Sequence, residues 1–225
     1  MPKKQKDLLI TLAWPEGMVT ASGAWYDNTY NPFLSKDNKY RVGHSAIVLV
    51  DSKNGKCHYL DFGRYHTPRN KGRVRDEETD HDVKIDTIAI IENHKITNIK
   101  ELLHELFKKE STHGDGALYA AVLPKVDFKK AYVSAKKMQD KGMITYGPFT
   151  INGTNCSRFV STIIQKANPR WIKKIRLKFP FCVTPSPKRN VSITNNNYYV
   201  VKKDLFKLVK KTKIHAYFSS IETWK

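Results

Sequence analysis

Three side chains of this sequence, Cys156, His44 and Asp61, could together carry out acyl transfer. Cleavage of an amide, ester or thioester by a cysteine requires a thiolate, an imidazole that moves the proton, and a third group that orients the imidazole. The three residues lie far apart in the chain, so this hypothesis depends on the elements that position them.

Cys156 stands at the start of a predicted helix within residues 145–166. It is followed by apolar residues at the spacing of one buried helix face, namely Phe159, Val160, Ile163 and Ile164. Thr154 or Asn155 is a suitable N-cap, which places Cys156 in the first turn. The helix dipole there, with a nearby imidazolium, can lower a thiol pKa to about 3.5–7.5, and the Cys156 N–H could form part of an oxyanion hole. The same position also suits a small core residue, and the pattern alone leaves both interpretations open.

His44 and Asp61 lie on the two strands of a predicted β-hairpin that spans residues 40–63. Residues 47–50 are apolar and mostly β-branched, and the Asn54-Gly55 pair indicates the turn. His44 comes at the start of the first strand, and Asp61 comes late in the second.

The contact between His44 and Asp61 depends on the register of this hairpin. If Val50 pairs with Cys57, His44 lies opposite Gly63 and Asp61 is its diagonal neighbour on the same face. A slip of two residues would place Asp61 directly opposite His44, whereas a slip of one would place the two on opposite faces.

Other residues are candidates for substrate binding. Trp25 and Tyr26 belong to an aromatic loop that could line a cleft, although such residues more often pack. Tyr146 and Asn155 belong to the segment that leads into Cys156. Arg64, together with Arg73 and Arg75, could bind an anionic substrate.

No metal site and no cofactor are predicted. His66, Asp80, His81 and Asp82 lack the spacing of metal ligands, and three scattered cysteines form neither a zinc site nor a disulfide framework. Cys57 and Cys182 do not begin a helix and are interpreted as structural residues.

The remaining elements follow from periodicity. We expect strands over residues 7–14, 83–91, 117–123, 143–149 and 198–201, and helices over 97–107, 127–142 and 204–210. The charged segment 64–82 contains Pro68 and Gly72 and is expected to be a long surface loop.

The net charge of +19 is concentrated near the C-terminus, where residues 170–225 hold fourteen Lys or Arg against Asp204 and Glu222. Such a surface attracts phosphate groups of nucleic acid or anionic lipid, but no nucleic-acid-binding motif accompanies it. No segment is long and apolar enough to span a bilayer. The apolar run 8–14 is too short for a signal peptide, so a cytoplasmic protein is expected.

Two segments carry a resemblance to a known superfamily, VGHSAIVLV at residues 42–50 and TNCSRFV at residues 154–160. They resemble the circularly permuted branch of the NlpC-type papain-like cysteine hydrolases and acyltransferases. That branch includes lecithin:retinol acyltransferase-like proteins, phospholipase/acyltransferases and several bacterial amidase-like proteins. The order of His before Cys matches the permuted branch, and the resemblance covers residues 40–63 and 145–166.

The resemblance implies a role for each residue of the site and a bacterial source for the protein. Cys156 would be the nucleophile and His44 the base. A polar residue on the next strand would orient His44, with Asp61 as the first choice and His58 as the second.

These observations predict an α+β fold, in which an antiparallel β-sheet packs against a helix carrying an N-terminal Cys, as in permuted papain-like proteins. Residues 1–169 would form the papain-like domain, and residues 170–225 a basic C-terminal extension packed on it. The predicted function is a thiol hydrolase or acyltransferase that acts on an amide, ester or thioester of a small molecule, peptide or lipid through an acyl-cysteine. One alternative is a non-catalytic binding protein of the same fold, whose basic face binds nucleic acid or anionic membrane. The other is a structural protein in which Cys156 is a core residue.

Overall fold

The computed structural model of the chain describes residues 6–20, 35–36, 39–41, 43–178 and 182–211. Trp25 and Tyr26, two of the candidates for substrate binding, lie outside the described residues. In the part of the chain that the structure describes, no helix is long and apolar enough to cross a membrane.

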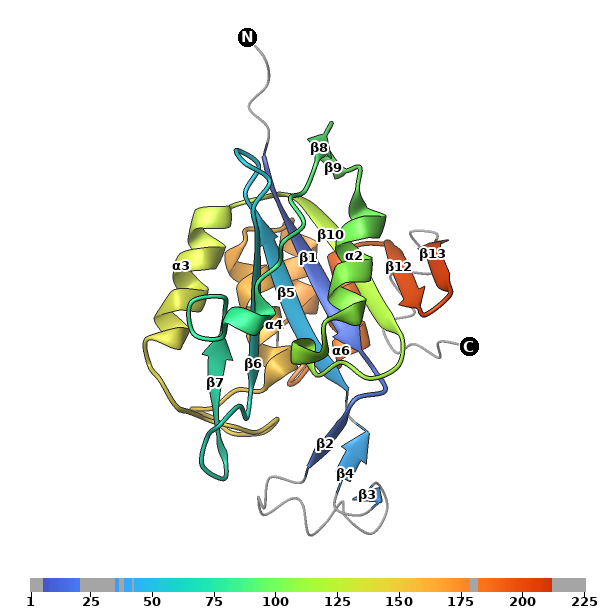
Figure 1. The fold of residues 1–225 in the computed structure, drawn as a ribbon. Coiled ribbons are helices and arrows are strands. Elements are labelled where there is room, and N and C mark those ends of the chain that lie inside the picture. The colour runs from blue at the N-terminus through green and yellow to red at the C-terminus, as the bar shows by residue number, and fades with distance from the viewer. Residues whose placement is uncertain (1–5, 21–34, 37–38, 42, 179–181, 212–225) are drawn as a thin grey trace.

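The centre of the fold is an eight-stranded sheet with the strand order β11-β7-β6-β5-β1-β10-β12-β13 (Figure 1). Every pair of neighbouring strands in it is antiparallel, as predicted. Its strands are β1 (Asp7–Trp14), β5 (His44–Val50), β6 (Cys57–Gly63), β7 (Lys71–Arg75), β10 (Leu118–Val126), β11 (Ile144–Thr145), β12 (Asn197–Lys202) and β13 (Leu205–Lys210). Two small sheets are formed by β2 (Met18–Thr20), β4 (Lys39–Arg41) and β3 (Ser35–Lys36), and by β8 (Ile91–Glu92) with β9 (Lys95–Ile96).

Helices cover both faces of the large sheet. Figure 1 shows α2 (Ile99–Lys108) in front of it, with α4 (Cys156–Lys166) and α6 (Pro187–Thr194) behind. Helix α3 (Phe128–Gln139) packs beside α4 on the rear face, and α5 (Trp171–Arg176) lies next to α6. Side chains alternate along a strand, so β1 and β5 contribute residues to two separate cores, one on each face of the sheet. All residues of both strands except Asp7 are buried.

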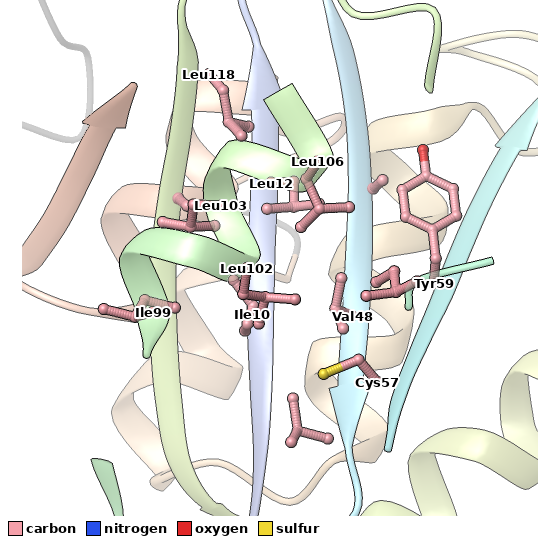
Figure 2. Close-up of a cluster of buried hydrophobic side chains, with 14 of the residues drawn as sticks. Ile10, Leu12, Val48, Cys57, Tyr59, Ile99, Leu102, Leu103, Leu106 and Leu118 are labelled. Carbon is pink, nitrogen blue, oxygen red and sulfur yellow. The ribbon is translucent and has the colours of Figure 1, made fainter. Parts of the chain in front are cut away.

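The front core lies between α2 and the central strands, as Figure 2 shows. The buried face of α2 carries Ile99, Leu102, Leu103 and Leu106, which follow the predicted helical spacing. These side chains pack over residues of β1, β5 and β6 that include Ile10, Val48 and Tyr59. The predicted helix over residues 97–107 is therefore confirmed, with Asn98 rather than Thr97 at its N-cap position.

The prediction of a long surface loop over residues 64–82 is wrong, because residues 71–75 form β7 and pair with β6. Val74 and Arg75 are buried there, at 1% and 2% exposure. The charged sequence resembles a loop, but the charge of Arg75 is neutralised in the strand by Asp61 on β6.

Two other elements differ from prediction. Residues 84–90 are extended but pair with no strand of the described chain, because side chains of α2 and its cap bind their backbone. The Glu105 carboxylate accepts from the N–H groups of Asp86 and Thr87, and the Asn98 side chain accepts from that of Ile90. Residues 205–210 form strand β13 rather than a helix. The two-residue turn that joins Lys202 to Leu205 returns the chain directly along β12.

The chain beyond residue 170 joins the same sheet. Strand β12 pairs with β10, and α6 packs against β1 and β10. The division of the chain at residue 169 stays a prediction.

Candidate active site

Cys156 is the first residue of α4, as the sequence predicts. Asn155 precedes it in extended conformation, and the Asn155 side-chain oxygen accepts a hydrogen bond of 2.8 Å from the Arg158 N–H. This contact is an N-cap, and the first N–H groups of a helix, here including that of Cys156, have no acceptor within it. Cys156 is 7% exposed and therefore lies just beneath the surface.

His44 and Asp61 are in direct contact. The hairpin adopts the register that pairs Val50 with Cys57, so Asp61 pairs with Ala46 and is the diagonal neighbour of His44. The Nε2 atom of His44 lies 3.1 Å from Oδ2 of Asp61, and Asp61 is fully buried. Trp14 stacks on the His44 ring, with 5.8 Å between ring centroids and 26° between planes, and so restricts the imidazole.

Cys156 reaches His44 at the start of β5. His44 and Asp61 belong to the alternating residues that face α2, whereas α4 packs on the opposite face (Figure 1). The Cys156 sulfur lies close enough to the His44 side chain and to the Ser45 backbone N–H for both to lower the pKa of the thiol. Because Nε2 of His44 is occupied by Asp61, Nδ1 is the nitrogen left to exchange a proton with the sulfur.

Three further side chains also bind Asp61, two of which, Tyr59 and Tyr65, the sequence did not assign to the site. The Tyr59 and Tyr65 hydroxyls donate to Oδ2 at 3.0 and 2.8 Å, and Arg75 donates to both carboxylate oxygens at 3.1 and 2.8 Å. Arg75 therefore holds a buried carboxylate of the protein, and it does not play the predicted role of binding an anionic substrate. Recognition of residues 71–75 as a strand would have revealed this pair, because Arg75 lies directly opposite Asp61.

The ionisation of the three central residues follows from these contacts. Burial alone would lower the pKa of His44, but hydrogen bonds to Asp61 and Cys156 outweigh it and raise the pKa to about 9. Burial disfavours the charged form of Asp61, yet hydrogen bonds from His44 and Arg75 hold the pKa of that carboxyl well below its usual range. Burial likewise opposes a thiolate at Cys156, while the His44 contact lowers the thiol pKa overall. The raised pKa of His44 and the lowered pKa of Cys156 both favour a thiolate–imidazolium pair over the neutral pair.

The remaining candidates lie in different surroundings. The Arg64 guanidinium sits over the Tyr146 ring, 5.3 Å from its centroid, and Tyr146 bridges to Thr154 just before Cys156. Asn155 caps α4, as described above. His58 points to the face opposite Asp61, where its Nδ1 lies 3.6 Å from Glu77 and its ring packs edge-on against Phe128 and Tyr132.

The other two cysteines differ from Cys156 in their ionisation. Cys57 is buried in the front core, and burial raises its pKa to about 12. Burial also raises the pKa of Cys182. Within the described ranges, no group of three His, Cys, Asp or Glu side chains could hold a metal ion.

The large antiparallel sheet, with the helix that starts at Cys156 and other helices packed on its two faces, defines an α+β fold in which His44 precedes Cys156 in the chain. Residues 9–171 match the model of a family described as Type VI secretion system effector TseH-like. The match covers well over half of the chain, and the protein therefore belongs to the TseH-like effector family.

A solved structure supports this fold. The crystal structure of the Type VI secretion system effector TseH is similar to this chain with a TM-score of 0.61 and 18% sequence identity. The similarity covers 92% of this chain and 100% of that chain. At this identity the likeness establishes the fold alone. No curated protein matches the sequence.

These findings agree with the papain-like superfamily that the motifs suggest, but they do not single out the lecithin:retinol acyltransferase-like branch. The predicted cytoplasmic localisation is not confirmed, since the family is one of secretion-system effectors.

Proposed function

We propose that this protein is an effector that works as a thiol hydrolase or acyltransferase, with Cys156 as nucleophile, His44 as proton carrier and Asp61 as the group that orients His44. The observation that carries the proposal is the 3.1 Å contact between His44 and the buried Asp61 carboxylate beside Cys156, the first residue of α4, whose thiol pKa is lowered by His44. As a member of an effector family, the protein would act after export rather than in the cytoplasm of the cell that makes it.

The first chemical step would form the acyl-enzyme. The Cys156 thiolate attacks the carbonyl carbon of the substrate, a C–S bond forms, and negative charge moves to the carbonyl oxygen. The Cys156 N–H and the positive end of α4 stabilise that charge. The bond to the leaving amine, alcohol or thiol then breaks, and this group takes the proton of the His44 imidazolium.

The second step would release the acyl group. His44 removes a proton from water, or from an acceptor alcohol or amine, whose oxygen or nitrogen attacks the acyl-cysteine. The C–S bond breaks, the acid or the transferred acyl product leaves, and the thiolate–imidazolium pair is restored. Hydrolysis and transfer of the lecithin:retinol acyltransferase-like kind share the first step and differ only in this acceptor.

The proposal predicts a distinct pH dependence of Cys156. Iodoacetamide is expected to alkylate Cys156 rapidly at neutral pH, because the His44 contact lowers the thiol pKa. Turnover of an amide substrate is expected to fall as the pH rises through about 9, because His44 then loses the proton that the leaving amine needs. Peptide mapping by mass spectrometry and a pH–rate profile would measure the two effects.

Cys57 and Cys182 provide internal controls in the same sample. Both are expected to react slowly at neutral pH, because burial raises each thiol pKa. If Cys156 reacts no faster than these two in the folded protein, the catalytic proposal is wrong.

Helix α5 favours a second candidate function, binding to an anionic membrane. Its apolar residues face solvent, with Trp171 at 71%, Ile172 at 39% and Ile175 at 41% exposure. Its lysines turn toward the protein instead, and Lys173 and Lys174 donate to the Thr194 carbonyl and the Asn168 side chain. An exposed Trp within a strongly basic segment is typical of a surface that inserts among anionic headgroups.

Vesicle co-sedimentation would test this candidate. The protein is expected to bind vesicles containing phosphatidylglycerol more tightly than vesicles of phosphatidylcholine alone, and Trp171→Ala is expected to weaken binding several-fold. Ile88→Ala removes another exposed apolar residue that is not part of α5, at 54% exposure, and should leave binding unchanged. Salt-sensitive binding to a DNA duplex without binding to vesicles would contradict the membrane candidate.

A further inference from the structure

Arg75 is a buried charged side chain next to the site. It ends β7, directly opposite Asp61 on β6, so both side chains point to the same face of the sheet. Its Nε donates to Oδ1 of Asp61 at 3.1 Å, and its Nη2 donates to Oδ2 at 2.8 Å. The same Nη2 donates to the Ser111 carbonyl at 2.9 Å, and the guanidinium lies 3.4 Å from the centroid of the Tyr65 ring. With 2% exposure, Arg75 is fixed on several sides and shielded from water.

These contacts determine the orientation of the Asp61 carboxylate. Oδ1 is taken by Arg75, which leaves Oδ2 to accept from Nε2 of His44 at 3.1 Å. The Tyr59 and Tyr65 hydroxyls donate to the same Oδ2. Both stay protonated and uncharged at neutral pH. Rotation of the carboxylate would break the bidentate contact with Arg75. The direction of the His44 bond is therefore set by a residue that does not touch His44 in any contact of the described chain.

The charges of the cluster balance only when Arg75 is included. A Cys156 thiolate and the Asp61 carboxylate supply two negative charges, and the His44 imidazolium and Arg75 supply two positive charges. Unpaired charges are strongly disfavoured in a buried site. Without Arg75 the cluster would hold one excess negative charge. It would relieve that excess by protonating Asp61 or by returning the Cys156–His44 pair to its neutral form.

We propose that Arg75 is a positioning residue of the active site, which keeps Asp61 ionised and turned toward His44 and thereby maintains the reactive thiolate of Cys156. Tyr59 and Tyr65 support the same carboxylate as neutral donors. The inference rests on the proposed function, because it assigns Arg75 a role in the reactivity of Cys156. The ionisable groups that bear on His44 are Asp61, Tyr65, Cys156, Arg75 and His113, and His113 stacks on Tyr65 with 5.4 Å between centroids.

Alkylation of Cys156 as a function of pH tests the proposal on the full chain without knowledge of the substrate. Wild-type protein is expected to show an apparent thiol pKa below that of an ordinary cysteine, about 8.5. Arg75→Gln is expected to raise this apparent pKa by about one unit or more, so that the pH midpoint of the alkylation rate moves upward by the same amount. Arg75→Lys keeps the charge but loses the bidentate contact of the guanidinium, and should raise the apparent thiol pKa by an intermediate amount.

Arg73→Gln is the matched control. Arg73 lies two residues away on the same strand and makes a comparable bidentate contact, but with Asp80, at 2.6 and 2.7 Å. Its removal subtracts the same charge from β7 and removes no hydrogen bond to Asp61 itself, although it also releases the Tyr65 carbonyl that Arg73 Nε binds at 2.9 Å. The alkylation profile should therefore stay close to that of the wild type. Circular dichroism and thermal unfolding would verify that each variant is folded.

The outcomes separate this inference from the proposed function. A folded Arg75→Gln variant with the wild-type alkylation profile would overturn the role of Arg75. If Arg75→Gln does not fold, Tyr65→Phe decides, because it removes one donor to Oδ2 without changing the charge. A smaller upward shift in Tyr65→Phe supports the role, and an unchanged profile contradicts it. A wild-type Cys156 that reacts like an ordinary thiol would instead count against the proposed catalytic function.

Discussion

Cys156→Ala is expected to abolish formation of a covalent acyl-enzyme from p-nitrophenyl acetate. The wild-type protein should release nitrophenol in a burst and gain one acetyl group, located on Cys156 by mass spectrometry. Loss of the nucleophile should reduce the burst rate by roughly a thousandfold or more, since no neighbouring group can replace a thiolate in this reaction. The Ser157 hydroxyl is the nearest other nucleophile, 4.0 Å from the sulfur, and no hydrogen bond to a base activates it in the described structure.

Cys182→Ser is the control for this experiment. Cys182 is partly exposed, and burial raises its pKa, so its removal should leave the burst unchanged. An acetyl group that persists on Cys156→Ala at the wild-type rate would show that another residue is the nucleophile.

Asp61→Asn is expected to destabilise the protein by about 3–5 kcal/mol, the typical cost of leaving one member of a buried ion pair without its partner. Arg75 would keep its charge at 2% exposure, opposite a neutral amide. Urea unfolding followed by circular dichroism would measure the loss at neutral pH. Because the pKa of Asp61 is lower in the folded state, its ionisation stabilises the protein at pH values above the unfolded-state pKa of about 3.9. This stabilisation is lost as the pH falls through the lower pKa of the folded state. The difference between wild type and variant should therefore shrink in acid.

Asp80→Asn provides a matched comparison with a surface pair. The Arg73–Asp80 bridge is also bidentate, through Nη1 and Nη2 rather than Nε and Nη2, but its side chains are 23% and 14% exposed, against 3% and 0% for Arg75 and Asp61. Its loss should cost about 1 kcal/mol or less. Equal losses in the two variants would show that burial does not set the strength of the Arg75–Asp61 pair.

The parts of the site that local sequence determines were predictable. The cap residue and the apolar spacing placed Cys156 at the start of α4, and the Asn54-Gly55 turn led to the register that brings Asp61 to His44. Both features depend on residues close together in the chain. Their interactions can therefore be inferred from spacing alone.

The parts that depend on strand pairing without a clear turn or cap signal were not predictable in this way. The Lys71–Arg75 segment has the composition of a loop, and only the carboxylate of Asp61 makes a buried Arg75 acceptable. Strand β13 has apolar residues at a spacing that also fits a helix, and its pairing with β12 decides the outcome. In both cases tertiary contacts overrode the local pattern.

The separation of the site between the two faces of the sheet has a consequence for folding. His44 and Asp61 are 17 residues apart and can meet within one hairpin, whereas Cys156 follows His44 by 112 residues in the chain. Contacts between neighbouring segments usually form before distant ones, because distant contacts close longer loops. Until α4 packs against the sheet behind β5, Cys156 is not next to the His44 imidazole that accepts its proton. An incompletely folded chain would thus carry an ordinary, protonated thiol, and the reactive thiolate would appear only when the last layer of the fold is in place.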